Sequence, residues 1–204
     1  MDRDNQQQTV SDVEIGWLGG FLEGEGSICL QIHRRSAKEG RKTGTIRVTP
    51  KVIFTNTDRG MIDACVSILT RLGVGKYVCH SKPNNTKLCP KTSKEIHYVH
   101  ISGMKRIKRL LDVLSPCLYG AKRSRCERLL LFVNRRLDQA ECFDVGMNYK
   151  YDAEDVRLIL DFIKNSQSKQ YDHISRMLNE HTRDALHTKR AMMCSDLTRD
   201  GERV

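Results

Sequence analysis

Two glutamates, Glu23 and Glu25, stand at the end of a glycine-rich stretch, DVEIGWLGGFLEGEG, which covers residues 12–26. Carboxylate oxygens are the ligands that hard divalent cations such as Mg²⁺ prefer. The segment that follows, SICLQIHRR, is basic. These residue types therefore allow cation chemistry beside a positively charged segment. The glycines need a reason of their own, because each interior glycine costs a helix about 0.5–1 kcal/mol relative to alanine.

The stretch is nevertheless expected to be a helix. Ser11 and Glu14 have the spacing of a capping box. Apolar residues then recur at helical spacing, at Val13, Trp17, Leu18, Phe21 and Leu22. We expect this helix to end at Gly24–Gly26, which places both acids in its last turn.

From Ser27 the period changes from helical to two, which is typical of a half-buried strand. Apolar residues at 28, 30 and 32 alternate with Cys29, Gln31 and His33. A second strand is expected around residues 45–54, with Ile46, Val48, Val52 and Phe54 on one face and Arg47, Thr49 and Lys51 on the other. Pro50 indicates a bulge or an edge position there.

The rest of the chain extends this pattern. A helix capped by Thr57 or Asp58 ends at Gly73, and the later elements are strands at 76–82 and 95–102 and basic helices at 104–114 and 122–137. The order αββαββα predicts an α+β fold in which helices cover one face of an antiparallel sheet and leave the other face free. Polar and basic side chains on such a free face can enter the major groove of DNA.

The charge is unevenly distributed along the chain. The 204 residues carry a formal net charge of +10, with a pI near 9.3. Residues 1–26 hold one basic and six acidic side chains, whereas residues 27–59 hold eight and two, and residues 99–136 hold ten and two. A basic surplus concentrated in the middle of the chain favours a polyanionic partner, nucleic acid before membrane.

Other classes are disfavoured. No apolar run approaches the roughly 18–20 residues of a membrane span, and the N-terminal MDRDNQQQTV is neither a secretion signal nor a transit peptide. We therefore expect an intracellular protein, compartment open, whose eight cysteines stay reduced. Zinc is disfavoured because no C-x-x-C is present, although one set of residues could be imagined as ligands: Cys79, Cys89, His97 and His100.

The sequence LGGFLEGEG, residues 18–26, resembles the motif of the LAGLIDADG homing endonucleases, in its small residues, bulky apolar residues, acids and glycines. The context agrees, because a strand follows at once, FTNTD precedes the next helix, LGVG ends that helix, and Pro116 precedes AKRSRCERLLLFVNRR. The resemblance covers residues 11 to 137. It implies the family's saddle-shaped antiparallel sheet, with extra C-terminal helices in this chain.

The resemblance also implies a site. Two motif helices would pack together in a homodimer, with an interface that includes Gly16, Trp17, Gly19, Gly20 and Glu23; small residues permit close approach. Glu25, where the family commonly has Asp, and the Gly24 carbonyl would bind Mg²⁺ or another divalent cation such as Mn²⁺. Asn56 would contact catalytic water, and Lys122 would lie near the scissile phosphate, with Arg123 as the nearest alternative. No small-molecule cofactor is implied.

The implied activity is metal-dependent hydrolysis of both strands of a long, (pseudo)palindromic double-stranded DNA site, leaving 3′ overhangs. The enzyme would be encoded by an intron or a similar mobile element. The alternatives are a non-cleaving binder of the same fold, either an RNA maturase or a transcription regulator, and a protein-interaction module, which would not need a basic sheet face. The candidate DNA-binding residues are Gln31, His33, Arg34, Arg35, Lys38, Arg41, Lys42, Arg47, Thr49, Lys51, Lys76, His80, Lys82, Tyr98, His100 and Arg123.

Three segments are predicted: a disordered N-terminus at 1–10, the endonuclease domain at 11–145, and a helical extension with a frayed tail at 146–204. The extension includes YDHISRMLNEHTRDALHTKR, residues 171–190, which reads either as a weak helix-turn-helix or as helices that pack on the main domain or on a dimer partner. Its role and the DNA target are left open by the sequence.

Overall fold

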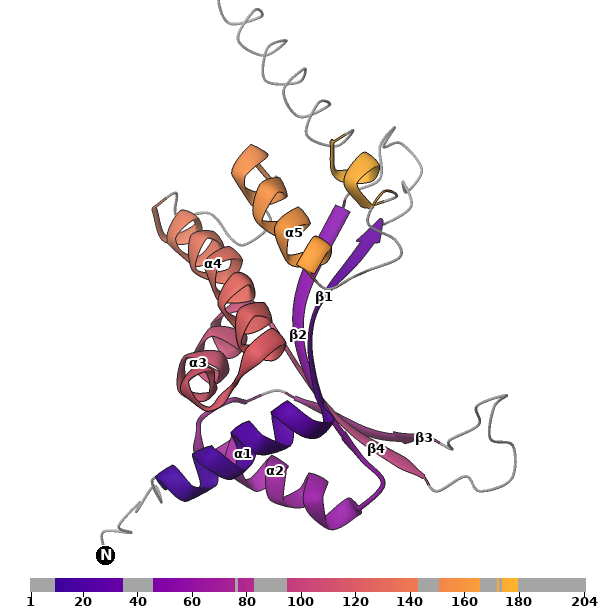
Figure 1. Ribbon diagram of the computed structural model, residues 1–204, viewed down its shortest axis with the longest axis vertical. Helices are drawn as coiled ribbons and strands as arrows, with labels where there is room; N and C mark the ends of the chain where they lie inside the picture. The colour runs from indigo at the N-terminus through magenta and orange to yellow at the C-terminus, as the bar shows by residue number, and fades with distance from the viewer. Residues whose placement is uncertain are drawn as a thin grey trace, which may run out of the picture.

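The computed structural model describes residues 10–34, 46–75, 77–82, 95–142, 151–165, 172 and 174–179. Figure 1 shows the order of the elements along the chain. The helices are α1 (Asp12–Glu25), α2 (Arg59–Arg71), α3 (Met104–Leu114), the short 3₁₀ helix η1 (Ser115–Cys117), α4 (Gly120–Cys142) and α5 (Ala153–Asn165). The strands are β1 (Gly26–Arg34), β2 (Ile46–Asn56), β3 (Val78–Lys82) and β4 (Ile96–Ser102).

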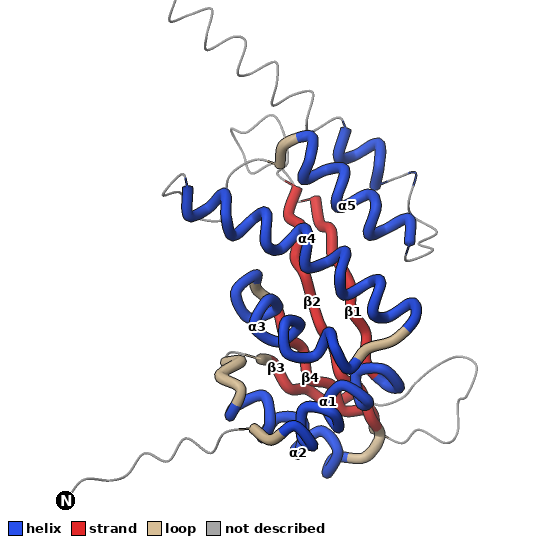
Figure 2. The backbone as a smooth tube through the Cα atoms, turned by 60° about the vertical axis from the view of Figure 1, so that its left-hand side comes forward, coloured by secondary structure: helices blue, strands red, loops and turns tan. Residues whose placement is uncertain are grey.

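The strands form one antiparallel sheet in the order β1-β2-β4-β3. β1 pairs with β2 along its whole length, from Gly26 opposite Phe54 to Arg34 opposite Ile46. β4 pairs with β2 only between Lys51 and Asn56. The far part of the β1–β2 hairpin therefore extends beyond the shared sheet as a two-stranded ribbon, which Figure 2 shows rising beside α4 and α5.

The described helices lie on one side of the sheet, and the strands curve along them (Figure 1). The predicted alternation is confirmed: Val48, Val52 and Phe54 are buried toward the helices, whereas Arg47 is exposed. In β4 the buried residues are His97, Val99 and Ile101, so Tyr98 and His100 face the other way. The predicted α+β class and element order are confirmed, with α4 beginning two residues earlier and ending later than expected.

Pro50 lies at an edge, as its chemistry requires. The Val48 N–H points away from β1, because it donates a hydrogen bond to the Tyr151 hydroxyl at the other edge of β2. Backbone N–H groups two residues apart in a strand point the same way, so Pro50 lacks a donor toward that side. β4 does not reach Pro50, since the β2–β4 pairing begins at Lys51. No ladder hydrogen bond is lost.

The predicted capping box at the start of α1 is confirmed. The Glu14 N–H donates to the Ser11 hydroxyl at 3.3 Å, and the Ser11 N–H donates to the Glu14 carboxylate at 3.0 Å. Arg71, at the end of α2, donates to both oxygens of the same carboxylate. One glutamate thus closes the first turn of α1 and joins it to α2.

α5 packs against α4 and β1. Its buried residues include an acid, Asp155, which pairs with the buried Arg136 of α4 at 3.1 Å. The predicted boundary between residues 145 and 146 lies outside the described residues and stays a prediction. None of the described helices is long and apolar enough to cross a membrane.

Candidate functional site

The last turn of α1 brings Glu25 to the point where the helix gives way to β1. Its carboxylate is exposed, and within the described residues no hydrogen bond or ion pair engages it. Its backbone carbonyl accepts a hydrogen bond from the Thr55 hydroxyl at 2.9 Å, which ties the end of α1 to β2. The backbone of Glu25 is therefore fixed while its carboxylate stays available to a ligand.

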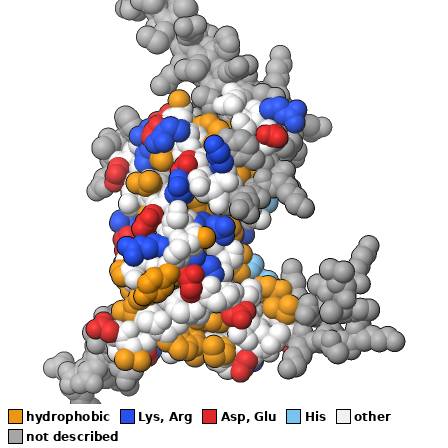
Figure 3. Space-filling view, viewed as in Figure 1, with side chains coloured by type: hydrophobic (Ala, Val, Ile, Leu, Met, Phe, Trp, Pro, Cys, Tyr) orange, Lys and Arg blue, Asp and Glu red, His pale blue; other side chains and the backbone are white. Residues whose placement is uncertain are grey.

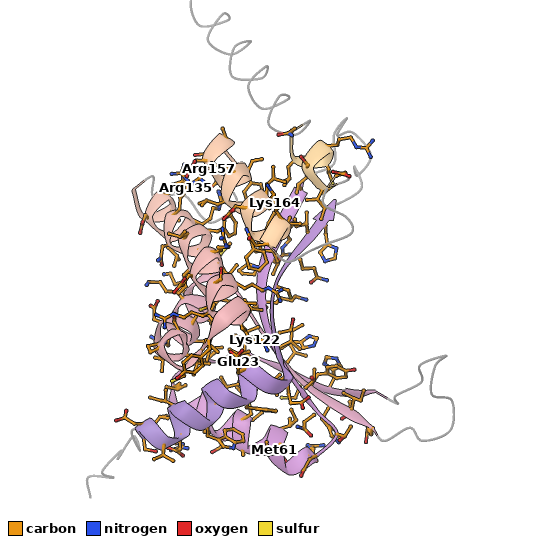
Figure 4. All side chains as sticks on the ribbon, viewed as in Figure 1. Glu23, Met61, Lys122, Arg135, Arg157 and Lys164 are labelled. Atoms are coloured by element: carbon orange, nitrogen blue, oxygen red, sulfur yellow. The ribbon has the colours of Figure 1, made fainter. Side chains whose placement is uncertain are left out.

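Lys122, in the first turn of α4, covers the end of α1. Its ammonium donates to the carbonyls of Leu22, Glu23 and Gly26 at 2.7, 2.5 and 2.9 Å. Figure 4 shows Lys122 directly beside Glu23. A cation is favoured at a helix C-terminus, where the carbonyls lack helical partners. Burial lowers the pKa of Lys122, an effect that the charges of Glu23 and Glu25 oppose and that of Arg125 reinforces.

Arg125 is a residue of this site that the sequence analysis missed. It lies three residues after Lys122 in α4, and hence on the same side of the helix. Its charge acts on Lys122, and also on Cys29 of β1, where burial raises the pKa and the charges of Lys51 and Arg125 oppose that shift. The Arg125 Nε is buried and has no hydrogen-bond partner among the described residues. The helical spacing from Lys122 was the signal that could have identified it.

Two predicted site residues have partners within the chain. Glu23, expected in the dimer interface, accepts a hydrogen bond from the Tyr119 N–H at 3.3 Å. Asn56, expected near catalytic water, accepts from the Asp58 N–H at 2.8 Å and so shapes the turn into α2, which Asp58 itself caps. The Asn56 amide nitrogen is not used by that turn, and its contact with water stays a prediction.

The glycines of α1 fall on two different sides of the helix. A Cβ added at Gly19 would lie 2.5 Å from the Cβ of Cys117, so Gly19 permits close packing of α1 on η1 within the chain. Its predicted place in a dimer interface stays a prediction. A Cβ at Gly16, Gly20 or Gly24 would meet nothing within 4 Å. These three positions, spaced by four, form an open stripe along α1.

The other predicted interface residue, Trp17, is half-buried and its ring contacts that of Phe21 in a tilted arrangement, with ring centroids 5.3 Å apart. Figure 3 shows hydrophobic side chains over α1 and α2, below a region over α3 and α4 where lysines and arginines gather. Val13, at the start of α1, is 81% exposed. The α1 face thus carries apolar surface of the kind that a second helix could cover.

The side of the sheet away from the helices, called here the open face, collects most of the described candidate DNA-binding residues. On the hairpin, Gln31 lies opposite Thr49 and His33 opposite Arg47. On the other two strands, His80 stacks on Tyr98 with centroids 4.9 Å apart, and His100 meets the His80 ring edge-on at 4.5 Å. The structure therefore brings these side chains, with Lys51, onto one surface.

The remaining candidates lie elsewhere. Arg123 is exposed on α4 and pairs with Glu127 at 3.0 Å. Arg34 is the last residue of β1 and Lys82 the last of β3, and the structure describes only the backbone of these two residues. Five others fall outside the described residues: Arg35, Lys38, Arg41, Lys42 and Lys76. So does most of residues 171–190.

The described residues contain no group of three or more His, Cys, Asp or Glu side chains that could hold a metal ion. For the disfavoured zinc set, His97 and His100 lie on opposite faces of the sheet, and the His97 Nδ1 contacts the Ser81 hydroxyl at 2.7 Å. Cys89 is outside the described residues. At the end of α1, an unpaired carboxylate beside a helix terminus fits a hard divalent cation. The described part of one chain offers that site a single unpaired carboxylate, that of Glu25.

The comparisons agree with this geometry. A family model described as the LAGLIDADG-like domain matches residues 12–114, which is half of the chain. The chain belongs to the LAGLIDADG family. Within the matched range lie the motif helix and the whole sheet, whereas α4 with Lys122, and α5, lie beyond it.

Solved structures of LAGLIDADG proteins show the same fold. The archaeal intron-encoded homing endonuclease I-Vdi141I, in complex with DNA, has a TM-score of 0.55 at 17% identity, covering 83% of this chain and 97% of the other. The homing endonuclease I-CvuI, with its target and Ca²⁺, has 0.53 at 17%, covering 83% and 94%. I-TnaI has 0.53 at 16%, covering 85% and 99%. No curated protein sequence matches the chain.

Proposed function

We propose that this chain is an intron-encoded homing endonuclease that hydrolyses both strands of a long, (pseudo)palindromic DNA site with a divalent metal ion, leaving 3′ overhangs. The observation that carries the proposal is the Glu25 carboxylate, which is exposed and unpaired among the described residues at the junction of α1 and β1. A protein that bound phosphates without cleaving them would gain nothing from a free carboxylate at that place, because the two charges repel. A metal ion removes that repulsion.

The Glu25 carboxylate and the Gly24 carbonyl would hold the ion. Bound Mg²⁺ or Mn²⁺ supplies an activated water and neutralises charge on the scissile phosphate. The chain's own groups position these ligands: Lys122 fixes three carbonyls in and just beyond the last turn of α1, and Thr55 fixes that of Glu25. Arg125, beside Lys122, adds positive charge for the DNA backbone. Asn56 is the candidate that contacts the water.

The active form in this proposal is a homodimer. Two carboxylates are needed to build the metal site, and the described part of one chain offers one. The open stripe of Gly16, Gly20 and Gly24 lets a second motif helix approach closely, which would bring the two Glu25 residues together. A two-fold dimer reads a DNA site whose halves are related by the same symmetry.

DNA would lie on the open face. Arg47 and Gln31 suit bidentate contacts with guanine and adenine edges. Arg47 lies opposite His33 and Gln31 lies opposite Thr49, and these two cross-strand pairs, called rungs here, place both strands of the hairpin against one groove. The DNA-bound state of I-Vdi141I and the target-bound state of I-CvuI support this assignment, and the intron origin of the former supports the origin proposed here.

The test begins with DNA selected from a pool of random sequences by binding in Ca²⁺. The selected DNA is then incubated with the protein in Mg²⁺ and Mn²⁺, and the ends are mapped. We expect cleavage of both strands with 3′ overhangs. We expect Glu25→Gln to bind the same DNA and to cut it on the order of 100-fold more slowly, or worse, because a metal ligand is lost.

Asp63→Asn is the matched control, since Asp63 is an exposed acid on α2 whose partner is Arg59. If the slower cleavage by Glu25→Gln comes from the lost metal ligand and not from the lost negative charge alone, Asp63→Asn is expected to cleave at the wild-type rate. Cleavage by Glu25→Gln at the wild-type rate would contradict the assignment. Selective binding with no cleavage in any divalent cation would instead favour the maturase or regulator class.

A further inference from the structure

The far part of the β1–β2 hairpin needs support from outside the sheet. Residues 46–50 of β2 pair with β1 but not with β4. A two-stranded ribbon is marginally stable in water. Yet this ribbon carries the Gln31–Thr49 and His33–Arg47 rungs of the open face. Whatever holds the ribbon in place also sets the position of those rungs.

Tyr151 holds it. The Tyr151 hydroxyl accepts a hydrogen bond from the Val48 N–H at 2.9 Å, across 103 residues of sequence. That N–H points to the edge that β4 does not reach, and two residues on, Pro50 has no N–H to offer. Tyr151 therefore takes the place of a neighbouring strand at this edge.

The position of Tyr151 is in turn set by α4 and α5. The Arg136 guanidinium lies 4.6 Å from the centroid of the Tyr151 ring, and the Phe132 ring centroid lies at 6.5 Å. Arg136 and Asp155 form an ion pair whose side chains are 2% and 0% exposed. Moving either partner of such a buried pair is costly, because the other charge would be left buried and unpaired.

Tyr151 is also close to a proposed DNA-reading residue. Burial raises the pKa of Tyr151, and the charges of Arg136 and Arg47 are among those that oppose the shift. Arg47 is the neighbour of Val48 in β2 and points to the open face. A shift of the Val48 backbone would move the Arg47 side chain with it.

We propose that Tyr151 is a positioning residue for DNA recognition, which fixes the far part of the hairpin so that its rungs meet the outer base pairs of each half-site. The proposal rests on the proposed function. His33 stands seven residues beyond Gly26 and Gln31 stands five. At about 3.4 Å per residue and about 3.4 Å per base pair, these rungs reach about five to seven base pairs from the end of α1.

The experiment compares the wild type, Tyr151→Phe and Tyr77→Phe. Tyr151→Phe removes the hydroxyl and keeps the ring. Tyr77→Phe is the matched control, because the Tyr77 hydroxyl contacts the Thr70 hydroxyl at 2.9 Å, at the end of α2. Each protein selects DNA from a fully random pool in Ca²⁺, and hydrogen exchange of the Val48 amide is measured by NMR.

In Tyr151→Phe we expect the Val48 amide to exchange about 3–10-fold faster. We expect preference at the outer positions, about five to seven base pairs from the cut, to fall toward random, with the inner positions unchanged. Tyr77→Phe is expected to match the wild type in both measurements. Equal loss at all positions would show a merely structural role and would overturn the proposal, as would an unchanged outer preference. A wild type that selects no DNA would refute the proposed function itself.

Discussion

At the scale of single residues, Lys122 combines two tasks that sequence alone could not separate. Its ammonium is a cap for α1, since it donates to three carbonyls in and just beyond the last turn. The same contacts hold it close enough to Glu25 for the two charges to interact. A lysine that fixes the end of the motif helix therefore also stands beside the proposed metal ligand.

Lys122→Met keeps most of the side-chain length and removes the ammonium. We expect it to lower the free energy of unfolding by about 1–2 kcal/mol, because three carbonyls lose a charged donor at a half-buried place. Urea unfolding measures the change. Lys108→Met is the control: Lys108 pairs with Asp112 on the partly exposed surface of α3, and its loss is worth about 0–1 kcal/mol. Equal effects of the two substitutions would contradict the capping role.

At the scale of the element, α1 uses its glycines differently on its two sides. Gly19→Ala would force a Cβ to within 2.5 Å of Cys117, so we expect a loss of about 1–3 kcal/mol in the free energy of unfolding. Gly16→Ala and Gly20→Ala meet open space and are expected to gain about 0.5–1 kcal/mol from helix propensity. Urea unfolding below the concentration of dimer formation measures all three. A stabilising Gly19→Ala would refute the packing of α1 on η1.

The link between α1 and α2 predicts a dependence on pH. The hydrogen bonds from Arg71, with that from the Ser11 N–H, lower the pKa of Glu14 from 4.5 to about 2. A carboxyl with a depressed pKa contributes stability that is complete above its unfolded pKa and is lost as the pH falls through the folded pKa. The melting-temperature difference between the wild type and Glu14→Gln is therefore expected to be constant above about pH 5 and to shrink between 4.5 and 2.

Glu127→Gln serves as the comparison, because Glu127 forms an exposed pair with Arg123 one turn away in α4. Its melting-temperature difference is expected to be small at every pH. If the Glu14→Gln difference did not shrink as the pH fell toward 2, the Arg71 pair would not be the source of the effect.

Sequence predicted the elements whose signals are local. The two-residue period of Ile46 and Val48 gave the strand face, and Ser11 with Glu14 gave the helix start. What sequence could not predict depends on contacts between distant segments. Gly19 and Gly20 are adjacent and identical in type, and only the position of η1 distinguishes them. The proposed role of Tyr151 depends on its hydrogen bond with Val48, and no periodicity in the sequence relates these two residues.

At the scale of the whole molecule, folding assembles the basic segments of the chain around one sheet. The described helices cover one side, and the open face is left with histidines, Arg47 and Lys51, which come from all four strands. The acidic end of α1 lies at the border of this surface, where β1 begins. The surface that would read DNA and the carboxylate that would bind metal are therefore joined through Gly26.

This arrangement predicts how binding responds to salt. Each cation that neutralises a phosphate contributes about −0.9 to the slope of log K against log salt. A homodimer brings two copies of Lys51, an open-face cation with no proposed base contact, to the DNA backbone. We therefore expect Lys51→Ala to reduce the slope by about 1.8, whereas a monomer would lose about 0.9. Arg157→Ala removes an exposed ion pair with Glu154 on α5, away from the open face, and is expected to leave the slope unchanged. Sedimentation of the complex counts the chains independently, and an unchanged slope for Lys51→Ala would remove the open face from the DNA interface.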